Sequence, residues 1–349
     1  MTDGPPVALP DIQSWRPLVA QYQRPRTWRA VLQLVTTLLP LALVFAAMYR
    51  LLALSFWWTL LLVLPAGALL VRTFVLMHDC AHGSFLESRR ANQFIGAITG
   101  LLTLIPFEHW RHEHSLHHAS AGDLDRRGHG DVDTLTVREY LARTRWGRLR
   151  YRIIRHPVVF LLLGPVFFVL EKRIPPRGAN AGPRQIRSVW TTNAAITIVG
   201  AGLAALVGPR VFLIYLPAYY LAIIAGLWLF FVQHQFENTY WENHQQWDYA
   251  TAAIAGSSFF RLPAFLQWFT GSIGFHHVHH LGPRIPNYNL QQCHDENPMF
   301  HRATVVTLRQ SVSALRLALW DEDAGRLVRF SGVHDVPRDE VEGKRVRPA

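Results

Sequence analysis

The segment VFLIYLPAYYLAIIAGLWLFFVQ occupies residues 211–233 and carries no charged side chain. About 20 predominantly apolar residues are needed for a helix to cross the hydrocarbon core of a bilayer. The segment is therefore predicted to be a membrane-spanning helix. The next residue is His234, so the helix is expected to leave the membrane beside a histidine.

Three further uncharged runs of similar length precede this segment, at residues 31–49, 51–71 and 189–207. Half of the chain is hydrophobic and 17% is charged, whereas soluble domains average about 25% charged residues. We expect four spans, at about 31–49, 51–77, 189–207 and 211–233. The second is expected to be one long helix that leaves the bilayer near Arg72.

The distribution of basic residues predicts the topology. The two breaks between paired spans, near Arg50 and at residues 208–210, are short and carry two basic residues in total. The other basic residues lie in the polar segments, so the positive-inside rule puts both tight turns outside and both termini in the cytoplasm. The expected location is a bacterial inner membrane. The apolar runs at 94–107 and 157–170 are too short to span and are expected to be interfacial or re-entrant.

The expected fold is thus an all-α integral membrane protein. Its parts would be a cytoplasmic lead at 1–30, a membrane domain at 31–300 with a histidine-rich helical cap, and a cytoplasmic tail at 301–349. The net charge of +11 fits a basic cytoplasmic side better than nucleic-acid binding, because no aromatic-interleaved basic module accompanies it. The two cysteines, Cys80 and Cys293, imply no disulfide framework.

Three histidine clusters lie in the predicted cytoplasmic segments, at residues 78–82 (HDCAH), 114–118 (HSLHH) and 276–280 (HHVHH). Helical positions i, i+3 and i+4 share one face, and imidazole suits Fe, Zn, Cu and Ni. Eight ligands are too many for one tetrahedral zinc ion, so the clusters predict two metals. The eight candidate ligands are His78, His82, His114, His117, His118, His276, His279 and His280.

Other polar residues near the clusters receive supporting roles. His234 emerges on the same side as the clusters and is the ninth candidate ligand. His112 and His277 fall outside the shared helical faces and are expected to support the ligands or the fold. Asp79 and Glu237 are candidates for hydrogen bonds to ligand imidazoles, although for Asp79 a place on the helix surface is an equal alternative.

The order and spacing of HxxxH, HxxHH and HxxHH, interleaved with paired spans, resembles the membrane fatty-acid desaturase family. Four sequence motifs are similar to those of its bacterial omega-6 (delta-12-like) acyl-lipid branch. They are HDCAHGSF at 78–85, WRHEHSLHH at 110–118, GDVDTLT at 130–136 and PRIPNY at 283–288. The resemblance implies two irons bound by the histidines of the three clusters, with His234 as the extra ligand. It also implies O₂ as co-substrate and a kinked, apolar substrate tunnel.

The resemblance further implies that the chain introduces a cis double bond into an acyl chain, using O₂ and two electrons. Some family members carry a fused cytochrome with a His-Pro-Gly-Gly haem motif, which this sequence lacks. An external donor such as ferredoxin or a b-type cytochrome is therefore expected.

Two alternatives remain. The same site could serve a hydroxylase or ketolase acting on a lipid, an alkane or a carotenoid. A membrane metal transporter or sensor would need ionisable residues within the spans, and the four uncharged runs have none. The double-bond position, acyl length, acyl carrier and oligomeric state are left open.

Overall fold

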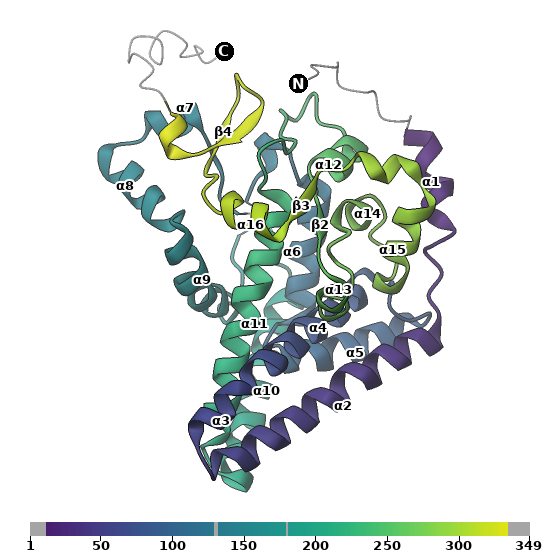
Figure 1. The fold of residues 1–349 in the computed structure, drawn as a ribbon, viewed down its shortest axis with the longest axis vertical. Helices are drawn as coiled ribbons and strands as arrows, with labels where there is room; N and C mark the ends of the chain where they lie inside the picture. The colour runs from purple at the N-terminus through teal and green to yellow at the C-terminus, as the bar shows by residue number, and fades with distance from the viewer. Residues whose placement is uncertain (1–11, 129–131, 179–180, 334–349) are drawn as a thin grey trace.

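The computed structural model describes residues 12–128, 132–178 and 181–333, and these residues are mostly helical (Figure 1). Within them, four helices are long and apolar enough to cross a membrane. This finding confirms the expected number of spans by length and composition. The four helices are α2 (Thr27–Leu52), α4 (Val63–His82), α10 (Pro183–Val207) and α11 (Val211–His234).

The first pair of spans is divided differently from the prediction. Arg50 lies in the last turn of α2, and a separate short helix, α3 (Phe56–Leu61), precedes α4. The side chain of Ser55 caps α3 by accepting the Trp57 N–H at 3.3 Å. The expected single helix over residues 51–77 was therefore wrong. A new helix begins at the Ser55 cap inside an apolar run, and no charged residue in the sequence indicates this break.

The second pair of spans is divided where it was expected. Residues 208–210 separate α10 from α11, and Gly208 has φ +89°. This left-handed conformation favours glycine, which has no Cβ to clash with the backbone.

The two shorter apolar runs form helices that pack against the spans. The first is shared between α5 (Arg89–Leu102), which packs along α4, and the start of α6 (Phe107–Ser120). The second forms α9 (Pro157–Lys172), which is bent by 80° from α8 (Arg145–Ile154). The bend follows from Pro157, because the residue before a proline avoids helical backbone angles. Together α8 and α9 have the length and composition of a broken span or a re-entrant loop.

Arg72, near which the second span was expected to leave the bilayer, packs inside the protein. Its side chain is buried inside the protein, where Nε donates to Thr37 Oγ1 of α2 at 3.0 Å. Its guanidinium lies 4.0 Å from the ring centroid of Trp268 and donates to the carbonyl of the same residue. Arg72 is therefore part of the packing between α2, α4 and α13 (Ala264–Phe269).

The described residues are mostly helical, as expected, but the cap also contains two small sheets. In one, β1 (Leu135–Thr136) pairs in parallel with β4 (Leu319–Asp321), which pairs antiparallel with β5 (Arg326–Val328). In the other, β2 (Phe259–Arg261) pairs in parallel with β3 (Val305–Thr307). Strands of two or three residues are too short to show a period-two pattern in the sequence.

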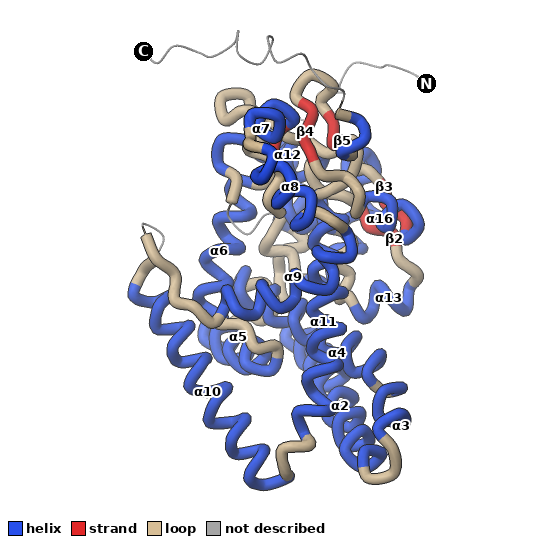
Figure 2. Tube along the Cα trace, turned by 90° about the vertical axis from the view of Figure 1, so that its left-hand side faces the viewer, coloured by secondary structure: helices blue, strands red, loops and turns tan. Residues whose placement is uncertain are grey.

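The strands and most of the short helices lie toward the end of the molecule opposite the α10–α11 turn, whereas the short helix α3 lies at the same end as that turn (Figure 2). Through β3, β4 and β5, the described part of the expected tail packs against the cap. The remaining elements are α1 (Ile12–Ala20), α7 (Val137–Ala142), α12 (Tyr249–Ala255), α14 (His276–Leu281), α15 (Asn287–Glu296), α16 (Leu308–Ala314), η1 (Leu124–Arg126), η2 (Pro298–Arg302) and η3 (Phe330–Gly332).

Candidate metal centre

Four helices bring the candidate ligands together at the boundary between the spans and the cap. His78 and His82 lie in the last turns of α4, which ends at Gly83 in a left-handed conformation (φ +67°). His234 is the last residue of α11. The second histidine cluster lies on α6 and the third forms most of α14.

The nine histidines form two groups, and in each group the candidate ligand atoms lie within 4.8 Å of one another. All nine residues proposed from the sequence are included. Group one consists of His78, His82, His114, His118 and His279. Group two consists of His117, His234, His276 and His280.

The second and third clusters are each divided between the two groups. His114 and His118, at i and i+4, belong to group one, whereas His117, at i+3, belongs to group two. The third cluster mirrors this arrangement, because its i, i+4 pair belongs to group two and His279 to group one. At about 100° per residue, i and i+4 are about 40° apart around a helix while i+3 points about 60° to the other side. One helical face therefore serves two sites.

The Nε2 atoms within each group converge closely. In group one, His118 Nε2 lies 3.1 Å from His114 Nε2 and 3.0 Å from His279 Nε2. In group two, His234 Nε2 lies 2.9 Å from His276 Nε2 and 3.2 Å from the Nε2 of His117. A neutral imidazole has one N–H, so three converging Nε2 atoms cannot all be satisfied by hydrogen bonds among themselves.

The surroundings of the two groups fit metal ions. Burial holds the pKa of His118, and likewise of His279 and His280, well below the usual range, so these rings are neutral and offer lone pairs. Nε2 of His78 and of His82 is buried without a hydrogen-bond partner. Among the described residues no carboxylate belongs to either group. The residues present therefore fit two metal ions with all-nitrogen ligand sets.

Asp79 lies directly behind group one. Its Oδ1 atom is 3.2 Å from Nδ1 of His78, and its Oδ2 atom accepts the backbone N–H of Asn287 at 2.7 Å. The carboxylate thus connects the end of α4 to the start of α15. A carboxylate in this position can fix the orientation of a ligand imidazole.

The other three residues considered from the sequence lie elsewhere. His277 points away from both groups, with Nε2 3.0 Å from Nδ1 of His294, and burial lowers its pKa to about 3. His112 is partly exposed and belongs to neither group. Glu237 was a wrong candidate for a hydrogen bond to a ligand imidazole. Its side chain is 63% exposed, and its Oε1 atom lies 3.3 Å from Nη1 of Arg326.

Two aromatic residues contact the histidines and were not identified from the sequence. The ring of Trp110 stacks on His114 with centroids 4.3 Å apart. The ring of Phe230 lies 5.1 Å from His117 and 5.3 Å from His234. Each aromatic residue precedes a candidate ligand by four positions on the same helix. That i, i+4 spacing is the signal that could have found them.

A cavity of about 490 Å³ reaches both groups. His78 and His114 of group one line it, together with His117 and His276 of group two. Its walls come mainly from apolar side chains of α4, α9 and α11, including Leu70, Phe74, Phe160, Phe168, Ala222 and Leu227. The size and the apolar walls are typical of a small-molecule site.

Five charged side chains interrupt the apolar wall: Glu113, Asp133, Arg155, Glu171 and Lys172. Nζ of the buried Lys172 lies 2.6 Å from Oε2 of Glu113, which directly precedes His114. Arg155 is also buried and donates to Oε1 of Gln235 at 3.1 Å. The cavity therefore combines an apolar channel with a few charged positions.

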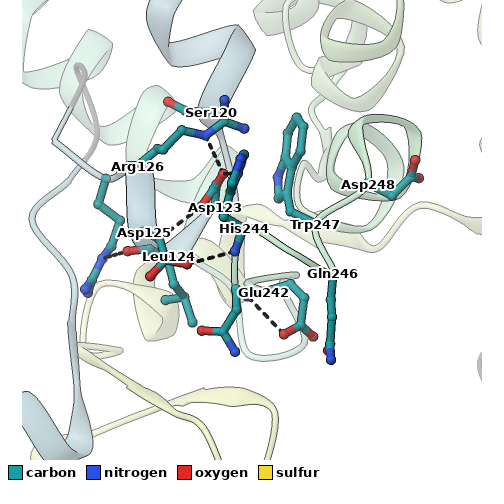
Figure 3. Close-up of polar contacts among 12 residues, drawn as sticks. Ser120, Asp123, Leu124, Asp125, Arg126, Glu242, His244, Gln246, Trp247 and Asp248 are labelled. Atoms are coloured by element: carbon teal, nitrogen blue, oxygen red, sulfur yellow. Dashed lines mark hydrogen bonds and ion pairs between the residues drawn. The ribbon is translucent and has the colours of Figure 1, made fainter. Parts of the chain in front are cut away.

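A polar network holds together the two segments that follow α6 and α11 (Figure 3). Oδ2 of the buried Asp123 accepts from Nε of Arg126 at 2.5 Å and lies 2.8 Å from Nδ1 of the His244 ring. Burial alone would raise the pKa of Asp123, but the hydrogen bonds from Arg126, His244 and the Asp125 N–H lower it. The Leu124 N–H donates to the Glu242 carbonyl, and the Glu242 N–H donates to the Gly122 carbonyl, which strengthens the connection.

The fold and the site define a class: helical proteins with membrane-length apolar helices and two histidine groups, each able to hold a metal ion, beside an apolar cavity. A sequence profile of the family described as "Fatty acid desaturase" matches residues 55–309. The chain is 40% identical over 321 residues to a fatty acid desaturase of Bacillus subtilis, covering 91% of each chain. The protein belongs to the fatty acid desaturase family, so the expected oxidoreductase activity, desaturation of fatty-acyl chains, is confirmed.

More distant relatives include two omega-3 desaturases. The chain is 29% identical over 239 residues to a Synechocystis protein named "sn-1 acyl-lipid omega-3 desaturase (ferredoxin)", matching 65% of this chain and 63% of that protein. It is 26% identical over 244 residues to the endoplasmic-reticulum omega-3 fatty acid desaturase of Nicotiana tabacum, matching 65% and 61%. The matches thus span less than two thirds of these two relatives. The names of these two relatives give an omega-3 position for the double bond, whereas the sequence motifs around the histidine clusters resemble the omega-6 branch.

Proposed function

We propose that this protein desaturates fatty-acyl chains carried by membrane lipids, using O₂ and two iron ions held by the two histidine groups. The observation that carries the proposal is the contact between both groups and one apolar cavity. The cavity offers an alkyl chain a path past both sites, and the Bacillus subtilis relative is a fatty acid desaturase.

The two groups divide the ligands five to four. Irons bound there would supply the activation of O₂ that removes one hydrogen from each of two adjacent methylenes. The protein's part is to hold neutral imidazoles in place and keep water away. Asp79 would fix the ring of His78, and the stacked ring of Trp110 would fix that of His114.

The cavity would bind and orient the acyl chain. Each buried methylene contributes about 0.8 kcal/mol, so apolar walls bind a long alkyl chain without polar contacts along its length. A rigid channel also limits which methylenes can reach the histidine groups. Trp110 and Phe230 stand where the channel meets these groups and would exclude water from them.

The reaction needs two electrons and two protons from outside the site, because O₂ is reduced to two waters while the acyl chain supplies two hydrogens. We assign the electrons to an external carrier such as ferredoxin or a b-type cytochrome. The name of the Synechocystis relative includes ferredoxin, which supports the first choice. The net charge of +11 would attract an acidic carrier.

The proposed location is a bacterial inner membrane, with the histidine groups and both termini on the cytoplasmic side. The cap with its histidine-bearing helices lies at one end of the spans, and the two tight turns lie at the other (Figures 1 and 2). Only two basic residues, Arg50 and Arg210, lie near those turns. Because Lys and Arg are concentrated on the cytoplasmic side of membrane proteins, this scarcity supports an outward orientation for the turns.

The test is to express the chain in a host that lacks its own desaturase and to profile the fatty acids of each lipid class. New cis double bonds would support the proposal, and their position would decide between the omega-6 and omega-3 branches. New hydroxyl or keto groups would point instead to the hydroxylase or ketolase reaction.

A further inference from the structure

One face of α11 forms a continuous wall of the cavity. Tyr219, Ala222, Gly226, Phe230 and Gln233 line the cavity and follow one another at intervals of three or four residues. At 1.5 Å per residue, this wall runs for about 21 Å along the helix axis. It ends beside His234, the ligand candidate that terminates α11.

Gly226 lies near the middle of this wall and leaves it open. A Cβ atom added at Gly226 would meet nothing within 4 Å. Its φ is not positive, so the backbone does not require glycine here. A glycine inside a helix costs about 1 kcal/mol relative to alanine, and at this position the open space is the feature that glycine provides.

The packing of other glycines shows the contrast. A Cβ at Gly67 of α4 would lie 3.1 Å from Leu221, and one at Gly164 of α9 would lie 3.3 Å from Leu227. These two glycines allow α4 and α9 to approach α11 closely. At Gly226 no neighbour comes this close, and the residue lines the cavity.

The walls near Gly226 are apolar and favour the hydrocarbon end of a substrate. Leu70, Val71, Ala222 and Ile223 line the cavity here and pack in one apolar cluster with Tyr219. The hydrocarbon end of an acyl chain that passes the histidine groups would therefore extend along α11 toward Tyr219.

We propose that Gly226 determines how much of the acyl chain can extend beyond the metal centre, and so limits the chain length that the enzyme accepts. This inference rests on the proposed function. Gly226 precedes His234 by eight residues, which is about 12 Å along the axis. A staggered carbon chain advances about 1.25 Å per carbon, given bonds of about 1.5 Å. A side chain at position 226 would block the channel on the order of ten carbons beyond the centre.

The test compares Gly226→Leu and Gly226→Ala with the wild type in the desaturase-free host, fed a series of saturated fatty acids that increase by two carbons. Gly202→Leu is the matched control, because a Cβ at Gly202 of α10 also meets nothing within 4 Å but this residue does not line the cavity. Gly226→Leu should lower conversion of the longest chains relative to the shortest by about tenfold. Gly226→Ala should shift the ratio less, and Gly202→Leu should leave it unchanged.

The ratio of products separates this role from general damage, because misfolding lowers all products together. If Gly226→Leu does not accumulate in the membrane, the smaller substitution Gly226→Ala decides the question. An active wild type with the same chain-length distribution in both position-226 variants would overturn this inference alone. A wild type without desaturated product would overturn the proposed function, and this inference with it.

Discussion

His118 of group one and His280 of group two stack with ring centroids 4.2 Å apart and planes inclined by 23°. The two candidate metal sites are thus adjacent and share a wall made by α6 and α14. Because each of these helices supplies ligands to both groups, the sites depend on the same packing. Loss of one ligand should weaken its own site first and the neighbouring site less.

His234→Ala tests this division. His234 is the one group-two residue from α11, and its Nε2 atom lies 2.9 Å from that of His276. The variant should retain about one metal ion per chain instead of two, with activity lowered by at least about 100-fold. Metal analysis of purified protein measures the first effect, and the fatty-acid profile measures the second.

His112→Ala is the matched control for that experiment. His112 lies on the histidine-bearing helix α6 but is partly exposed and belongs to neither group. It should keep both metal ions. An equal loss of metal in the two variants would contradict the assignment of His234 as a metal ligand of group two.

Asp79→Asn tests the residue behind group one. The variant keeps an acceptor for the Asn287 N–H but replaces the carboxyl group beside Nδ1 of His78 with an amide. Loss of such a supporting carboxylate typically lowers metal affinity or activity by about 10- to 100-fold. Competition with a chelator should remove metal from the variant at correspondingly lower chelator concentration. Unchanged metal retention would mean that Asp79 only connects α4 to α15.

Asp123 provides a test that depends on pH. Its folded-state pKa is lowered, so the ionised carboxylate stabilises the fold above the unfolded pKa of about 3.9. That contribution is lost as the pH falls through the still lower folded pKa. Asp123→Asn should therefore reduce the free energy of unfolding by about 1–3 kcal/mol at neutral pH, because charged hydrogen bonds are lost. Thermal unfolding in detergent should show a smaller difference between the two proteins at pH 3 than at pH 7. A constant difference would contradict the assignment.

The sequence predicted the spans and the nine histidines because both leave strong, simple signals. An uncharged run of membrane length has few alternatives, and helical spacing selects residues on one face. The same spacing also contains the division between groups, since the i, i+4 pair and the i+3 residue diverge around the helix. The pattern of one helix does not reveal that division, because it depends on a second helix that supplies the complementary ligands.

The errors have physical causes that single-sequence patterns do not show. The break at Ser55 lies inside an apolar run, so hydropathy has no signal for it. The strand Val305–Thr307 is stabilised by pairing with residues more than 40 positions earlier, which is a long-range effect. Glu237 follows His234 closely, but α11 ends at His234 and the chain beyond it carries the Glu237 side chain to the surface.

Metal stoichiometry tests the central claim most directly. The full chain, expressed with ample iron and purified in detergent, should contain about two iron ions per chain, in line with two all-histidine groups of five and four residues. Removing the iron with a chelator and restoring it should abolish and recover desaturation. One zinc ion per chain, or no metal after iron-replete expression, would contradict the two-iron site.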